Sequence, residues 1–272
     1  MGTATGALPA DIDAIAEWLA RLRRGHGLDA AQAALAPFQT HFAEHARLTE
    51  LAQWHQSLWW QTFDFGSIRL ERRGPEHLEF VRYVLSQREF AYRLKRLPEA
   101  VTNEGLWESL SRDKASLIPE AGSIQWVVYR ATVPIGLSMF VNISFRDRAA
   151  EQIMGVLPGY DTSFLVGDTY CASLMFAFNC LGLNKVRGLI YAGNEAIALQ
   201  QERLGFKREG VLRSAVWNSD QCVYEDLIQI ALLREEFNAN RVLQRHIRRQ
   251  AHSPELDQVR QFSREPLRTA PE

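Results

Sequence analysis

The order of strand and helix signals after residue 67 constrains the fold more than any other feature of the chain. A short strand at 68–70 precedes helical segments at 75–85 and 104–112, and strands follow at 125–129, 136–143 and 151–157. A helix at 168–180, a strand at 185–191, a helix from Asn194 and a hairpin over 206–232 complete the order. Strands and helices mixed in this way predict an α/β (α+β) domain, with helices packed on a mixed sheet.

The first 64 residues carry helical periodicity and no strand signal. Ile12, Ile15 and Leu19 recur at three- and four-residue spacing, as on one face of a helix. We therefore expect an N-terminal helical extension over 1–64, a central domain over 65–237 and a charged C-terminal tail over 238–272. Three tryptophans near the end of the extension are expected to anchor it on the central domain; the alternative is a hydrophobic ledge for a binding partner. They are Trp54, Trp59 and Trp60.

The tail contains a basic stretch that can form a helix. A solvated tail is the expected outcome for this stretch, with mobility expected of the last twenty residues, and attraction of an acidic protein or RNA is the alternative. The arginines are Arg241, Arg245, Arg248 and Arg249.

Charge and hydropathy exclude several classes of protein. The net charge of −1 favours neither a nucleic-acid partner nor an acidic disordered tail. No apolar run approaches the roughly 20 residues of a membrane helix, and the first residues lack the basic start of a secretory signal. Three cysteines without metal-type spacing (Cys171, Cys180 and Cys222) are expected to be reduced and buried. Together these features predict a cytoplasmic protein.

The segment from His41 to His45 matches H-x-x-E-H, in which two histidines on one helix turn flank a glutamate. Such a pair can chelate zinc, with Glu44 as a base. A five-residue match arises easily by chance, so helix-surface histidines are the better interpretation, and we expect no bound metal.

The segment 194–210 has clear helix ends. Asn194 suits an N-cap, because its side-chain oxygen can accept a hydrogen bond from an amide of the first turn. Gly205 stands where a helix C-terminus needs a residue that tolerates positive φ. The pattern predicts a helix that ends at Gly205 and enters a strand.

This segment resembles the last helix of the GNAT acyltransferase superfamily, in particular its ribosomal-protein N-acetyltransferase-like branch. The matching motifs are Asn194, Arg203-Leu204-Gly205-Phe206 and Glu209-Gly210. Further matches follow in the family's order: Glu151 seven residues before Pro158, then Phe176-Ala177-Phe178 and Gly182-Leu183-Asn184-Lys185-Val186. The resemblance covers about residues 67–237 and implies a GNAT-type, mostly antiparallel sheet flanked by helices.

The resemblance also implies roles for residues along the fourth core strand. Transfer to an amine needs a base for the amine, an amide for the oxyanion and a proton for the departing thiolate. Glu151 is the candidate base, directly or through a water, although a solvated strand-end glutamate is the plain alternative. Backbone amides among Met154, Val156 and Leu157 would polarise the thioester carbonyl.

Two further roles come from the strand and helix that follow. Asn194 would contact the pantetheine arm, or simply cap its helix. Tyr191 is the candidate acid, with Tyr224 as an alternative, and packing is an equally good explanation for both.

The loop that should cradle a diphosphate departs from the family. The glycines expected there are replaced by Thr162, Phe164 and Val166. By the resemblance, the cofactor-binding residues of this loop are Phe164, Val166, Gly167 and Asp168, of which only Gly167 is a glycine. The carboxylates of Asp161 and Asp168 would also repel a phosphate. Phe164 and Val166 could instead line an acyl channel.

Three functions remain open from the sequence. The first is an N-acyltransferase that moves an acyl group from acetyl-CoA or another acyl-CoA to a small amine, an amino sugar or a peptide. The second takes a longer acyl group from an acyl-carrier protein, whose single phosphodiester makes weaker demands on the loop. In that case the tryptophan ledge could hold the acyl chain or the carrier, and the basic stretch could attract the acidic carrier. The third is a degenerate GNAT domain that acts as a binding module.

Overall fold

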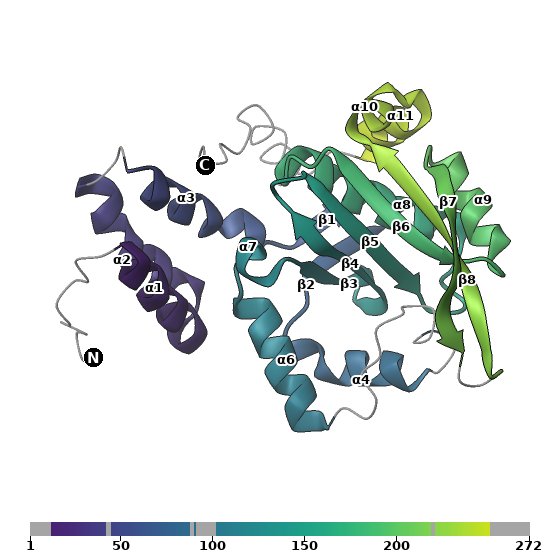
Figure 1. Ribbon diagram of the computed structural model, residues 1–272. Helices are drawn as coiled ribbons and strands as arrows, with labels where there is room; N and C mark the ends of the chain where they lie inside the picture. Colours follow the sequence, from purple (N-terminus) through teal and green to yellow (C-terminus); the bar gives the residue numbers. More distant parts are fainter. Residues whose placement is uncertain (1–11, 42–44, 88–89, 91–101, 219–220, 251–272) are drawn as a thin grey trace.

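The chain folds around an eight-stranded sheet (Figure 1). The structure is a computed structural model that describes residues 12–41, 45–87, 90, 102–218 and 221–250. The strand order is β1-β2-β3-β4-β5-β6-β8-β7, and every neighbouring pair is antiparallel except β5 with β6. This confirms the expected mixed, mostly antiparallel sheet. The strands are β1 (Phe63–Phe65), β2 (Ile68–Arg72), β3 (Ile124–Arg130), β4 (Val133–Ser144), β5 (Ala149–Val156), β6 (Lys185–Tyr191), β7 (Lys207–Asn218) and β8 (Val223–Leu233).

Helices cover both faces of the sheet. One face packs against α8 (Ser163–Met175), its π-helical continuation η3 (Phe176–Cys180) and α9 (Glu195–Arg203). The other face packs against α4 (Leu78–Ser86), which follows the 3-10 turn η2 (Pro75–His77), and against α6 (Asn103–Ala115). A short helix, α7 (Ile118–Ala121), leads from α6 into β3.

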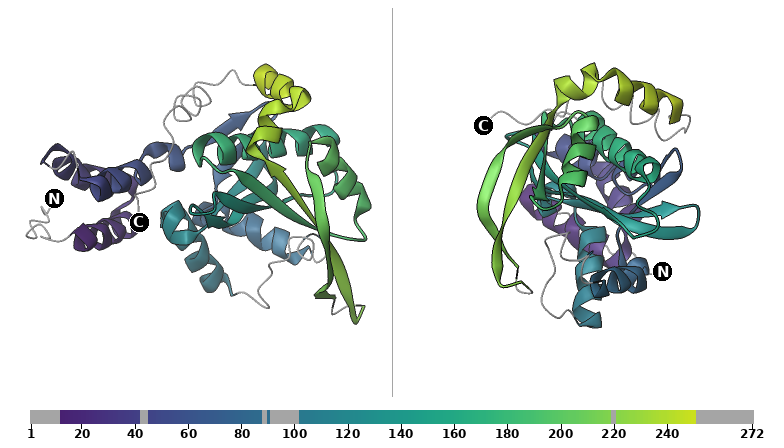
Figure 2. Two further views of the ribbon diagram at one scale, coloured as in Figure 1. Left: turned by 45° about the horizontal axis from the view of Figure 1, so that its top comes forward. Right: turned by 90° about the vertical axis from the view of Figure 1, so that its right-hand side faces the viewer.

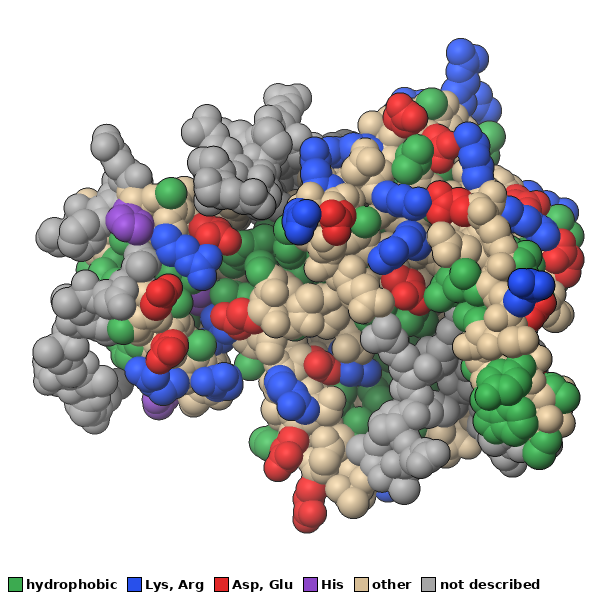
Figure 3. All heavy atoms as spheres, in the orientation of Figure 1, with side chains coloured by type: hydrophobic (Ala, Val, Ile, Leu, Met, Phe, Trp, Pro, Cys, Tyr) green, Lys and Arg blue, Asp and Glu red, His purple; other side chains and the backbone are tan. Residues whose placement is uncertain are grey.

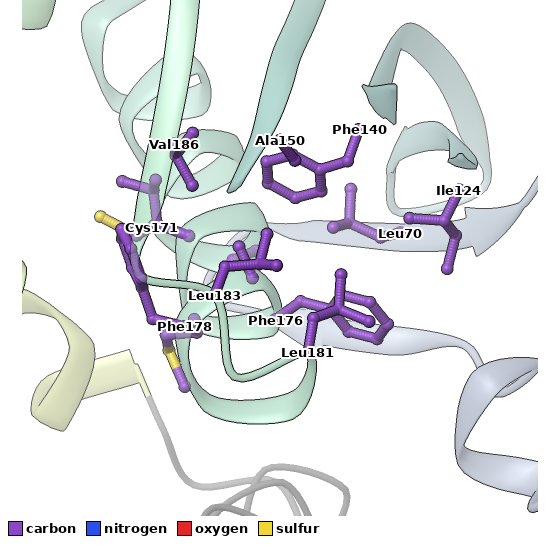
Figure 4. Packing of buried hydrophobic residues seen from close by; sticks show 14 of the residues in the cluster. Leu70, Ile124, Phe140, Ala150, Cys171, Phe176, Phe178, Leu181, Leu183 and Val186 are labelled. Atoms are coloured by element: carbon purple, nitrogen blue, oxygen red, sulfur yellow. The ribbon is translucent and has the colours of Figure 1, made fainter. Parts of the chain in front are cut away.

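Side-chain alternation along β4 divides it between two cores. Phe140 belongs to the core on the α8 side, whereas Met139 and Val141 belong to the core on the α4 side. Figure 4 shows the α8-side core, in which Phe140 of the sheet lies across from Phe176 of η3.

The N-terminal helices form a small unit beside the sheet (Figure 2). They are α1 (Ile12–His26), α2 (Leu28–His41) and α3 (Ala46–Trp54), followed by the 3-10 turn η1 (Ser57–Trp59). Their apolar faces make a cluster of their own that includes Leu19 and Leu35. Trp54 and Trp59 instead belong to the main core, and the Trp59 ring lies 5.9 Å from that of Phe176. The prediction that these tryptophans anchor the extension is confirmed.

A polar network at the base of this unit reinforces the attachment. Arg23 is buried and donates to His55 Nε2 at 2.9 Å and to Glu120 of α7 at 2.7 Å. Because Nε2 accepts from the guanidinium, the His55 ring is neutral and its Nδ1 donates to the Leu51 carbonyl at 2.6 Å. Burial lowers the pKa of His55, which favours the same neutral form.

Two elements differ from the sequence prediction. Helix α8 begins at Ser163, five residues before the expected start at 168, because Thr162 acts as its N-cap and accepts from the Leu165 amide. Most of the presumed diphosphate loop is therefore the first turns of a helix. Phe63–Phe65, which was not predicted as a strand, pairs with β2 as the edge of the sheet.

The segment expected to be a solvated tail begins with two helices, and the second coincides with the stretch predicted as able to form a helix. α10 (Arg234–Ala239) and α11 (Arg241–Gln250) lie along one end of the sheet (Figure 1), and Leu243 and Ile247 are buried in the main core. His246 Nε2 lies 2.6 Å from Asp168 Oδ1, which links α11 to α8. Residues 251–272 lie outside the described residues.

The cysteines differ in their surroundings. Cys171 and Cys180 are buried free thiols, as expected, and burial raises the pKa of Cys171 to about 12. Cys222 is exposed at the turn between β7 and β8, where the sequence had predicted a buried residue. Among the helices of the described ranges, none combines the length and the apolar character that crossing a bilayer needs.

Candidate functional site

The parallel strands β5 and β6 separate part of the way along their length. They pair at three positions, the last being Glu151 with Arg187. β5 continues to Val156 and β6 to Tyr191, so the two strands diverge beyond that pair. A pocket of about 360 Å³ lies in the resulting gap, a volume within the usual range for small-molecule sites.

The pocket draws its lining from both strands and from the helices of one face. β5 contributes Gln152 to Val156 and β6 contributes Gly188 to Tyr191. The exposed residues Pro158 and Asp161 line the mouth, and the segment after α4, on the other face, adds Gln87 and Phe90. The remaining lining residues are Val166, Tyr170, Asn194, Ile197, Gln201, Phe206 and Ile230.

Backbone direction along β5 decides which amides face the gap. The Leu157 amide donates to the Ile135 carbonyl of β4 at 2.8 Å, and the Arg148 carbonyl accepts from the Lys185 amide of β6 at 3.1 Å. Because backbone groups alternate along a strand, even-numbered residues of β5 direct theirs toward β6. The amides of Met154 and Val156 therefore point into the gap, and that of Leu157 does not.

Asn194 stands at the N-cap of α9, as predicted, but its side chain makes no capping hydrogen bond. Its carbonyl accepts from the Ile197 amide at 3.1 Å, and the residue lines the pocket. At the other end of α9, Gly205 has φ +98°, and the Phe206 amide donates to the Gln201 carbonyl in the pattern of a Schellman cap. Both ends of α9 thus fall where expected, but the side-chain hydrogen bond expected from Asn194 is not formed.

Glu151 lies at the closed end of the gap. It pairs with Val141 of β4, whose side chain belongs to the α4-side core, so the Glu151 carboxylate is on that face of the sheet. The carboxylate is half-buried and accepts from Asn142 Nδ2 at 3.3 Å. Glu151 is not among the residues that line the pocket, which begins one residue later at Gln152.

The predicted loop residues separate into two groups. Val166 lines the pocket, whereas Phe164 is 54% exposed and, like Gly167, is absent from the lining. Asp168 is fully buried away from the pocket: its Oδ2 accepts from the Ser67 amide at 3.0 Å and from Ser67 Oγ at 2.8 Å. These hydrogen bonds and the contact with His246 give the Asp168 carboxylate a structural role in joining elements of the fold.

The two tyrosines proposed as acids are in different places. Tyr191 ends β6 and lines the pocket. Tyr224 is 65% exposed and stacks edge-on against Trp217, with ring centroids 4.9 Å apart. Tyr191 lies in β6 and Tyr224 in the adjacent strand β8. Apolar side chains gather on the surface at the end of the β7–β8 hairpin (Figure 3).

Sequence reasoning missed two glutamines and a tyrosine of the lining. Gln152 is a buried polar residue on the same face of β5 as Ala150, and Gln201 lies three residues from Ala198 on the buried side of α9. Tyr170 lies deeper in α8; burial raises its pKa, and the adjacent Gln201 side chain opposes that rise. A polar residue at a position whose periodicity predicts burial is the signal that could have revealed both glutamines.

A possible metal ligand set occurs elsewhere in the described residues. The ligand atoms of Glu71, Glu76 and His77 lie within 4.8 Å of one another. His77 Nδ1, however, accepts from the Gly74 amide at 3.0 Å, so in the neutral ring Nε2 carries the proton and faces Glu71 at 3.5 Å. Glu76 pairs with Lys114. The H-x-x-E-H motif of the sequence lies partly outside the described residues, since 42–44 are not placed.

Comparison with known proteins shows a recurrent fold. No family model matches the chain. An uncharacterised N-acetyltransferase, YoaA of Bacillus subtilis (strain 168), is 25% identical over 113 residues, which are 41% of this chain and 64% of that protein. The similarity thus spans less than two thirds of the relative's length.

Solved structures are similar over roughly two thirds of the chain. The spermidine N-acetyltransferase of Vibrio cholerae, in complex with CoA and spermine, superposes with a TM-score of 0.57 at 19% identity over 63% of this chain and 98% of its own. A putative acetyltransferase superposes with a TM-score of 0.54 at 23% identity, covering 72% of this chain and 96% of its own. The chain therefore has the fold of GNAT-type N-acetyltransferases.

Proposed function

We propose that this protein is an N-acyltransferase of the GNAT superfamily that moves an acyl group from acyl-CoA to an amine. The observation that carries the proposal is the gap between β5 and β6, with a 360 Å³ pocket and the Met154 and Val156 amides directed into it. The motifs at Asn194 and Gly205 favour the ribosomal-protein N-acetyltransferase-like branch. The CoA in the similar Vibrio cholerae structure favours coenzyme A over a carrier protein as the acyl carrier.

The residues around the pocket suit an acyl-CoA donor. The N-terminus of α8 follows Asp161 at the mouth, where the partial positive charge of a helix end suits a phosphate. The Asn194 side chain, which makes no capping hydrogen bond, and the β5 amides that face the gap can offer hydrogen bonds to a pantetheine arm. Asp161 opposes a diphosphate, so we place the phosphates against the α8 amides and away from that carboxylate.

The chemistry is a nucleophilic acyl substitution. The amine nitrogen attacks the thioester carbonyl carbon, and the Met154 or Val156 amide stabilises the oxyanion. The carbon–sulfur bond then breaks, and the thiolate takes a proton from the Tyr191 hydroxyl. Glu151 accepts the proton that the ammonium nitrogen loses, through a water because its carboxylate lies outside the lining.

A small amine is the acceptor that the comparisons favour, because spermine is present in the similar Vibrio cholerae structure. Asp161 is the only charged side chain among the described residues that line the pocket, and a carboxylate attracts an ammonium group. We therefore propose a polyamine or a related small cationic amine as the substrate class.

Replacing Glu151 tests the mechanism. Glu151→Gln keeps the shape and the Asn142 contact but removes the base, so turnover of acetyl-CoA with spermidine should fall about 10²- to 10⁴-fold while CoA affinity is kept. Free thiol released from the donor measures turnover, and calorimetry measures binding.

Asp147→Asn is the matched control, because Asp147 is an exposed carboxylate nearby that bonds to Ser144. It should leave turnover unchanged. Unchanged turnover in Glu151→Gln would remove Glu151 from the mechanism, and failure of the wild type to bind or use any thioester would refute the proposed function.

A further inference from the structure

Two buried glutamines in the pocket have side-chain amides that lack a hydrogen bond of normal geometry within the described part of the chain. Gln152 of β5 is 7% exposed and Gln201 of α9 is 1% exposed, and both line the pocket. Among the described residues, neither atom of the Gln152 amide has a hydrogen-bond partner, and the Gln201 amide has only a contact with the Tyr170 hydroxyl that falls short of normal hydrogen-bond geometry. A buried amide without a partner is costly, so water fills this role in the empty pocket, and a ligand that displaces the water has to replace its hydrogen bonds or bear the cost.

The two amides lie where the acyl end of a donor belongs. Gln152 is the first β5 residue beyond the last pair with β6, so it marks the closed end of the gap. The mouth, at Asp161 and the start of α8, follows the other end of β5. Four residues separate Gln152 from Val156, which is about 13 Å along a strand. A donor whose phosphates stay at the mouth therefore extends its thioester end toward Gln152.

The walls around the amides limit what the acyl group can be. Phe206, Ile197 and Ile230 make the surroundings apolar, and the Tyr170 hydroxyl adds one more polar group beside Gln201. Among the described lining residues no cation is present, and Asp161 is acidic. An acyl group with a carboxylate would thus lack a counter-ion, and a plain alkyl chain would leave both amides unsatisfied.

We infer that Gln152 and Gln201 select an acyl group that carries an uncharged hydrogen-bonding substituent, such as a hydroxyl. The inference rests on the proposed function and names the class of donor for the same site. The step itself is unchanged: the amine nitrogen bonds to the carbonyl carbon, the carbon–sulfur bond breaks, and coenzyme A leaves as the thiol. The two glutamines determine specificity and take no part in proton transfer.

The test compares two donors that differ by one hydroxyl. Butyryl-CoA and 3-hydroxybutyryl-CoA are titrated into the full-length protein by calorimetry, with CoA, acetyl-CoA and malonyl-CoA alongside. The hydroxyacyl donor should bind about tenfold more tightly than butyryl-CoA, since the hydroxyl satisfies an otherwise unpaired buried amide. Malonyl-CoA should bind more weakly than acetyl-CoA.

Single variants assign the effect to the two residues. Gln201→Leu and Gln152→Leu remove one amide each at similar size and should abolish the tenfold preference while leaving the affinity for CoA itself within about twofold. Neither variant should unfold the protein, because each removes a buried polar group that lacks a partner; a melting temperature at or above that of the wild type checks this.

The outcomes separate the inference from the function on which it rests. If CoA and acetyl-CoA bind but butyryl-CoA binds as tightly as its hydroxyl analogue, the inference is overturned and the proposed function stands. If the preference persists in both variants, the inference is also overturned. If no CoA compound binds the wild type, the proposed function and the inference fail together.

Discussion

Asp168 offers a sharp test of how this fold is held together, because the sequence had assigned it to cofactor binding and the structure buries it. Its carboxylate is fully buried and accepts two hydrogen bonds from Ser67, at 3.0 and 2.8 Å, while His246 lies 2.6 Å away. These bonds connect α8 to the turn before β2 and to α11. Asp168→Ala removes all of them at once.

The expected loss follows from the contacts. Removing one partner of a buried, hydrogen-bonded charged group costs about 3–5 kcal/mol. For a chain of this size each kcal/mol lowers the melting temperature by about 2–4 °C, so Asp168→Ala should melt about 10 °C below the wild type. Thermal and urea unfolding give the stability, and a double-mutant cycle with His246→Ala should show coupling of about 1–3 kcal/mol.

Donor binding distinguishes the structural role of the Asp168 carboxylate from the cofactor-binding role that the sequence had predicted. Measured well below the melting transition, the affinity of Asp168→Ala for CoA should stay within about twofold of the wild type, since Asp168 does not line the pocket. Asp161→Ala is the control: Asp161 is exposed and accepts from the Gly159 amide, so its loss should change stability by under about 0.5 kcal/mol. An Asp168→Ala protein of unchanged stability that no longer binds CoA would refute the reasoning.

Two further predictions concern the backbone before β2 and the N-terminal unit. Gly66 has φ +58°, and a Cβ there would lie 2.6 Å from Asp168 Oδ2, so Gly66→Ala should lose about 1–3 kcal/mol in urea unfolding. Gly167→Ala, with nothing within 4 Å, should be neutral or stabilising, and equal effects of the two would contradict this. Burial lowers the pKa of His55 and Arg23 donates to its ring, so the fold needs the neutral imidazole. The unfolded chain binds the proton first, near pH 6.5, so stability should be complete above that pH and fall as the pH drops below it. His55→Gln should show a smaller loss of melting temperature between pH 7.5 and 5.5, and an undiminished loss would exclude His55 as the cause.

Local sequence determined most of the elements, because their ends depend on nearby residues. Gly205 permits the positive φ that ends α9, and Pro158 lies two residues beyond the end of β5. The start of α8 was misplaced because the resemblance predicted a loop there, while Thr162 supplies an ordinary N-cap. β1 was missed because three residues give too short a pattern, and its pairing with β2 is what makes it a strand.

The candidate site was only partly accessible from the sequence. Motif spacing indicated Asn194 and the stretch around Met154 as neighbours of one cleft, and both line the pocket. It did not reveal that the Leu157 amide is used by Ile135, or that Asp168 is turned to Ser67. These outcomes depend on partners in other strands and helices.

The sequence by itself determined the periodicity of each strand and helix, the order in which they follow and the residues that end them. The tertiary structure decided where β5 and β6 part, and hence that Gln152 and Gln201, from a strand and a helix about 50 residues apart, line the same pocket. The physical reason is that strand pairing ends where the elements packed around the two strands hold them apart. That balance of non-local contacts leaves no local pattern in the chain.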